Sequence, residues 1–258
     1  MKRLAGVLIA IIVLASFPAQ AEVAYKNYDL PEIPLEVSLP ERLLAVTRGE
    51  ALREEGNGDF LEAIEAGPAV LKELFLQNNI YLNAIEKGRQ YELVVTMLDY
   101  DGSREIWDFN LFPETEIIKM GGLVQSQYEM MGFTGMKISQ EGVYKTGGAV
   151  FLVLNLDNSY SENIRAYGRQ YYTVYNGRAL NLTLHSYEGP LTDELRFLAL
   201  DAVNHLKFPP RQANPADEAR VKNAIGGAVK GGIIGALIGA LIGAAGYFLK
   251  KKRKNKKA

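Results

Sequence analysis

Short apolar runs along the chain predict its strands. Residues 35–39 alternate between apolar and polar positions, and 43–47 could pair with them after a Pro-Glu-Arg turn. Further strands are expected at 80–85 and 91–98, and at 150–156. The last two are apolar on both faces, which is typical of strands inside a sheet that is covered on both sides.

Apolar residues spaced three and four apart predict the helices. One helix is expected over 113–131, and a last one over 192–206, where Thr192 can accept an N-cap hydrogen bond. Two short helices are expected at 60–65 and 69–77. The charged stretch 48–59 contains three glycines and is interpreted as a loop.

The clearest local pattern is a β-hairpin over residues 166–187. Two strand-like runs flank Asn176-Gly177, the pair that favours a two-residue type I′ turn. Such a turn pairs Tyr175 with Arg178 and fixes the register of both strands. One face of the hairpin then carries the expected core residues Tyr167, Tyr171, Thr173, Leu180, Leu182 and Leu184.

The opposite face of this hairpin is polar and carries Gln170, Tyr172, Asn181, Thr183 and His185. Tyrosine supplies apolar area with a hydrogen-bonding tip and is enriched at binding surfaces. These five residues are therefore a candidate ligand or partner face. If helices cover both sides of the sheet, the same residues would instead be buried, and the sequence leaves both interpretations open.

Several segments of the chain resemble a group of exported, membrane-anchored proteins of Gram-positive bacteria. The resemblance is carried by the hairpin segment 169–187 and by 203–208, with shorter pieces at 38–41, 79–85 and 94–97. Domains of that group have a PsbP-like fold. The resemblance thus implies an α+β domain with a central, mainly antiparallel sheet and helices on both faces, and it supplies no assigned activity or site.

The N-terminal 21 residues have the organisation of a secretory signal peptide. Lys2 and Arg3 precede an apolar run from 4 to 17, and Pro-Ala-Gln-Ala ends at Ala21. A basic start, an apolar centre and an A-x-A site define such signals. We expect cleavage after Ala21 and an extracytoplasmic domain over 22–208.

The C-terminal region predicts one transmembrane helix. After a linker at 209–224, residues 225–249 form the expected span, of which the last 19 carry no charge, about the length that crosses a bilayer as a helix. Its glycines are spaced four apart and share one helix face, which favours close packing against another helix. They are Gly227, Gly231, Gly235, Gly239 and Gly243.

A basic tail over 250–258 follows the span directly. It contains Lys250, Lys251, Lys252, Arg253, Lys254, Lys256 and Lys257. Positive residues remain on the cytoplasmic side and contact anionic lipid head groups. The expected arrangement is therefore a single-pass plasma-membrane protein with its domain outside and its tail in the cytosol.

Charge and residue types exclude several function classes. Residues 22–218 hold 17 basic and 30 acidic residues, a formal charge of −13, which argues against nucleic-acid binding. The chain has no cysteine and only two histidines, which are far apart in the sequence. It therefore offers no thiolate metal site, and no cofactor, metal or catalytic motif stands out.

The sequence thus favours a non-enzymatic, membrane-anchored binding or scaffold module of the cell envelope. An alternative is a sensing or accessory subunit of a membrane complex that docks through the glycine face of its helix. An envelope enzyme is the least favoured interpretation. A membrane and a protein partner, or a second copy of the chain, are the expected partners.

Overall fold

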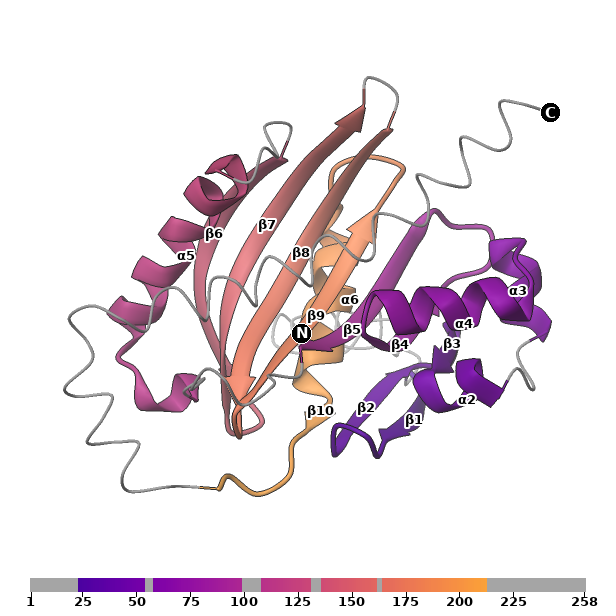
Figure 1. Cartoon of the computed structure of the whole chain (residues 1–258), viewed down its shortest axis with the longest axis horizontal. Coiled ribbons are helices and arrows are strands. Elements are labelled where there is room, and N and C mark those ends of the chain that lie inside the picture. Colours follow the sequence, from indigo (N-terminus) through magenta and orange to yellow (C-terminus); the bar gives the residue numbers. More distant parts are fainter. Residues whose placement is uncertain (1–22, 54–57, 99–107, 131–135, 162–163, 213–258) are drawn as a thin grey trace, which may run out of the picture.

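The computed structural model describes residues 23–53, 58–98, 108–130, 136–161 and 164–212 (Figure 1). The predicted signal peptide, the predicted span with its five glycines, and the basic tail lie outside these residues. None of the helices in the described part of the chain combines the length and the apolar character needed to cross a bilayer.

Two antiparallel sheets form the centre of the domain. The larger has the strand order β3-β4-β5-β9-β8-β7-β6, and the smaller has the order β1-β2-β10. The strands of the larger sheet are β3 (Leu44–Thr47), β4 (Ile80–Ile85), β5 (Tyr91–Leu98), β6 (Met136–Thr146), β7 (Ala149–Ser161), β8 (Ile164–Tyr175) and β9 (Arg178–Ser186). Those of the smaller are β1 (Tyr25–Leu30), β2 (Leu35–Pro40) and β10 (Leu206–Lys207).

Helices lie on both faces of the larger sheet, as the α+β prediction requires (Figure 1). On one face, α6 (Asp193–Asn204) and the smaller sheet share a core with β5, β8 and β9. On the other face, α5 (Glu114–Met130) and the 3-10 helix η1 (Phe109–Leu111) cover β7 and β8. The other end of that face is covered by α2 (Arg48–Arg53), α3 (Gly58–Ile64) and α4 (Pro68–Gln77).

The predicted hairpin is confirmed. Tyr175 pairs with Arg178, and Tyr171 lies opposite Leu182. Asn176 and Gly177 have φ values of +48° and +73°, as a type I′ turn needs at both central positions. Thr192 also caps α6 as predicted, because its side chain accepts a hydrogen bond from the Leu195 amide.

Two predictions about the N-terminal part are wrong. The strand at 44–47 pairs with β4 and not with β2, because a turn in which the Leu43 amide donates to the Pro40 carbonyl redirects the chain. The stretch expected as a loop contains α2. The Glu50 carboxylate accepts from the Thr47 amide at 2.8 Å and the Thr47 hydroxyl accepts from the Glu50 amide, a capping box that starts a helix.

Strand β6 was not predicted, and it explains a glycine within α5. A Cβ atom on Gly121 would lie 2.8 Å from the Gln140 side chain of β6 and 2.9 Å from Leu152 of β7. The glycine thus lets α5 approach the sheet closely, which offsets its low helix propensity.

Candidate functional site

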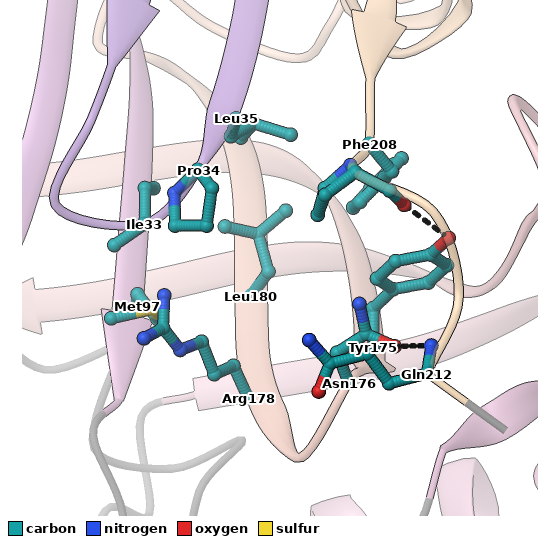
Figure 2. Close-up of a pocket in the computed structure, with 11 residues that line it drawn as sticks. Ile33, Pro34, Leu35, Met97, Tyr175, Asn176, Arg178, Leu180, Phe208 and Gln212 are labelled. Atoms are coloured by element: carbon teal, nitrogen blue, oxygen red, sulfur yellow. Dashed lines mark hydrogen bonds between the residues drawn. The ribbon is translucent and has the colours of Figure 1, made fainter.

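A cavity of about 380 Å³ opens between the two sheets, at the turn end of the β8–β9 hairpin (Figure 2). Its volume lies at the lower end of the range of about 300–1,000 Å³ found for small-molecule sites. We call it the inter-sheet pocket. Most of its walls are apolar and come from Ile33, Pro34, Leu35, Met97, Leu180, Phe208 and Pro209.

The polar lining of the inter-sheet pocket gathers around the hairpin turn and the chain segment that leaves the domain. It consists of Tyr175, Asn176, Arg178 and Gln212. Ile33, Pro34 and Leu35 face this group from the start of β2 (Figure 2). The pocket therefore combines an apolar interior with polar groups at one end, an arrangement suited to a ligand that is mostly apolar.

One wall of the pocket is residues 208–212, which we call the exit segment because the chain passes through it toward the C-terminal region. The Tyr175 hydroxyl donates to the Pro209 carbonyl at 2.8 Å. The Asn176 side chain donates through Nδ2 to the Pro210 carbonyl at 3.2 Å and accepts through Oδ1 from the Gln212 backbone N–H at 2.8 Å. The hairpin turn thus binds the exit segment through three hydrogen bonds.

Aromatic packing and one ion pair hold the exit segment as well. The centroid of the Phe208 ring lies 4.6 Å from that of the Tyr175 ring and 6.0 Å from that of the Phe151 ring. Arg211 Nε lies 3.4 Å from Asp108 Oδ2, and Asp108 also caps η1. These contacts fix the place where the chain leaves the domain.

Arg178 lines the inter-sheet pocket, and within the described residues its charge has no acidic partner. Its guanidinium donates to the Glu32 carbonyl oxygen at 3.4 Å, and among the described residues it forms no ion pair with a carboxylate. Figure 2 shows its side chain reaching toward Met97. The pocket therefore offers one available positive group beside apolar walls.

The candidate face predicted from the hairpin lies on the other side of the larger sheet. Its members Gln170, Tyr172, Asn181, Thr183 and His185 are between 0% and 6% exposed. The interpretation that packing covers this face is therefore the one the structure supports. The five residues do not form an open ligand face, and the structure does not bring them to the inter-sheet pocket.

Strand register adds three residues to this polar region. Glu92 pairs with His185 and Thr96 pairs with Asn181, while Asn83 pairs with Val94 beside Thr183. Cross-strand partners share one face of a sheet. We call Asn83, Glu92, Thr96, Gln170, Asn181, Thr183 and His185 the polar strip. It runs over β4, β5, β9 and β8 between α4 and α5 (Figure 1).

Burial changes the titration of both ionisable groups of the polar strip. Burial raises the pKa of Glu92 to about 7, opposed by hydrogen bonds that its carboxylate accepts from Tyr187 at 2.6 Å and Asn83 at 3.1 Å. Burial lowers the pKa of His185 to about 4. His185 is therefore neutral near pH 7, whereas Glu92 is partly protonated there.

The amides of the polar strip are incompletely satisfied. Buried Asn83 Oδ1, Gln170 Oε1 and Asn181 Nδ2 find no hydrogen-bond partner within the described part of the chain. Each such atom costs about 1–3 kcal/mol of stability. In the described part of the chain, no group of three or more histidine or acidic side chains is placed to hold a metal ion.

The inter-sheet pocket was missed by sequence reasoning because its walls come from four separated regions of the chain. A partial signal was present in the apolar, proline-containing stretches at 33–35 and 208–210. Such stretches supply side chains that pack without continuing a helix or strand. The contact between them depends on the pairing of β10 with β2, which no local pattern predicts.

No protein-family model and no curated protein matches the chain. Solved structures that are similar include the PsbP protein CyanoP of Synechocystis, with a TM-score of 0.42 and 10% identity over 76% of this chain and 99% of that one. A protein of unknown function from Pseudomonas aeruginosa gives a TM-score of 0.35 and 12% identity over 73% and 99%. LpqN, involved in cell envelope biogenesis of Mycobacterium tuberculosis, gives 0.32 and 13% over 76% and 97%. At these values the comparisons carry no argument about the pocket.

Proposed function

We propose that the chain is a membrane-tethered binding module of the cell envelope that takes an apolar chain into its inter-sheet pocket. The observation that carries the proposal is the pocket itself, a mostly apolar cavity of about 380 Å³ that opens between the two sheets. The predicted signal peptide and span support the tether, and the acidic surface makes nucleic acid a poor partner.

The position of the pocket supports the link between binding and tethering. One of its walls is the exit segment, which contains the first residues of the linker predicted at 209–224, ahead of the predicted span. A pocket beside the tether would remain close to the membrane surface, where molecules with long apolar chains are concentrated. The exit segment would also sense occupancy, because its Phe208 and Pro209 line the cavity.

The test is binding of a neutral probe with one alkyl chain, dansyl dodecylamide, to the full chain held in amphipol. We expect saturable binding by the wild type and a loss of at least about tenfold in affinity, about 1.4 kcal/mol, in Leu180→Trp. Leu180 is 5% exposed and lines the pocket, so a larger side chain there occupies the ligand's space. Ile33→Trp fills the pocket from the opposite wall and should act in the same way.

The matched control is Phe197→Trp, which places the same side chain on the outer face of α6, where Phe197 is 68% exposed. This variant should bind as the wild type does. Equal binding by the wild type and by both pocket-filling variants, with unchanged thermal unfolding, would exclude the pocket as the binding site.

A further inference from the structure

We infer that the ligand of the inter-sheet pocket is an amphiphile with a single apolar chain and an anionic head group, and that Arg178 binds the head. This inference rests on the proposed function and specifies the chemistry of its ligand. The juxtaposition that supports it is a guanidinium at the polar end of a cavity whose remaining walls are mostly apolar (Figure 2).

The apolar walls set the form of the tail. Seven of the lining residues are apolar, and they come from the turn between β1 and β2, from β2, β5 and β9, and from the exit segment. Burying an alkyl chain against them is favourable in proportion to the apolar area that it removes from water. A cavity at the lower end of the ligand-site range accommodates one such chain better than the two chains of a membrane phospholipid.

The polar end sets the charge of the head. Tyr175 and Asn176 use their side chains to hold the exit segment, so they are already engaged. Arg178 has only a 3.4 Å hydrogen bond to a backbone carbonyl among the described residues. A guanidinium presents several donors in one plane and pairs with carboxylate or phosphate through two parallel hydrogen bonds.

The net negative charge of the domain means that an anionic head group would bind at Arg178 rather than at the surface in general. With 17 basic and 30 acidic residues over 22–218, the surface repels anions in general. An anion that binds must therefore gain from a particular contact. At the mouth of the pocket that contact is Arg178, beside walls that lower the local dielectric and strengthen the ion pair.

The experiment compares dodecanoate with dodecanol as competitors of dansyl dodecylamide on the full chain in amphipol, at about pH 8. We expect dodecanoate to bind at least about tenfold more tightly than dodecanol, a difference of about 1.4 kcal/mol. Arg178→Gln should remove this preference and leave dodecanol binding unchanged. Arg178→Lys should restore part of it, because lysine retains the charge without the planar donor pair.

The outcomes separate the inference from the proposed function. Equal affinity for both competitors in the wild type, with saturable probe binding, would overturn the anionic head and keep the apolar pocket. No saturable probe binding would overturn both. A preference for dodecanoate over dodecanol that persists in Arg178→Gln would overturn the assignment of the head group to Arg178.

Discussion

At the scale of single residues, Glu92 and His185 should give the stability of the domain opposite pH dependences. They pair across β5 and β9 and both are about 2% exposed. Burial raises the pKa of Glu92 from 4.5 to about 7, so folding favours its protonated form and its contribution is lost as pH rises from 4.5 to 7. Burial lowers the pKa of His185 from 6.5 to about 4, so its neutral form favours folding and stability is lost as pH falls from 6.5 to 4.

The two effects oppose each other in the wild type, and single substitutions should separate them. In Glu92→Gln only the His185 effect remains, so the free energy of unfolding should rise as the pH rises from about 4 to 6.5. In His185→Gln only the Glu92 effect remains, so the free energy of unfolding should fall as the pH rises from about 4.5 to 7. Over its pH range, each variant's free energy of unfolding should change by about 3 kcal/mol, because a pKa shift of about 2.5 units corresponds to 1.36 kcal/mol per unit. Urea unfolding of the full chain in mild detergent measures this, and identical pH profiles for both variants would contradict it.

At the scale of elements, the larger sheet should depend on apolar side chains on both of its faces. Leu182 of β9 packs toward α6, and Leu154 of β7 packs toward α5, and both are fully buried. Leu182→Ala and Leu154→Ala should each lower the free energy of unfolding by about 2–5 kcal/mol. Chemical unfolding midpoints measure the loss. A loss below about 1 kcal/mol at either position would contradict the packing described for that face.

Elements that depend on local rules were predictable from the sequence. The hairpin register followed from Asn176-Gly177, and the start of α6 from Thr192, because a turn and a cap are decided by neighbouring residues. The pairing of β3 with β4 was not, since a strand that follows a turn can join either of two sheets. Propensity alone did not reveal β6 either, whose residues alternate weakly and gain their order from β7.

The surroundings of the polar residues could not be predicted from local patterns either. Arg169 lies opposite Leu184 on the core face of the hairpin, which the apolar pattern does not explain. Its guanidinium lies 2.7 Å from Glu141 and donates to the Tyr171 hydroxyl at 2.9 Å. Glu141 belongs to β6, the strand that the sequence did not predict. The polar hairpin face was likewise identified correctly as polar, but its burial depends on tertiary packing.

At the scale of the whole molecule, the exit segment connects the domain to the predicted tether. Three hydrogen bonds and the Phe208 ring hold residues 208–212 in place, so the inter-sheet pocket and the start of the linker predicted at 209–224 lie close to each other. A ligand that enters the pocket must contact this segment. In the proposed function, residues 208–212 therefore couple ligand binding to membrane anchoring, because the same segment lines the pocket and leads to the predicted span.

The orientation of the chain across the membrane can be tested because the sequence contains no cysteine. Phe197→Cys places a thiol on the outer face of α6, where the native side chain is 68% exposed, and Ala258→Cys places one at the end of the basic tail. In intact bacterial cells, a membrane-impermeant maleimide should label the first variant at once and the second only after permeabilisation. Positive residues stay in the cytosol during insertion, which is the physical reason for this order.

The wild type is the control for background labelling. The opposite order of labelling would contradict the proposed orientation, and equal labelling of both variants in intact cells would contradict the span.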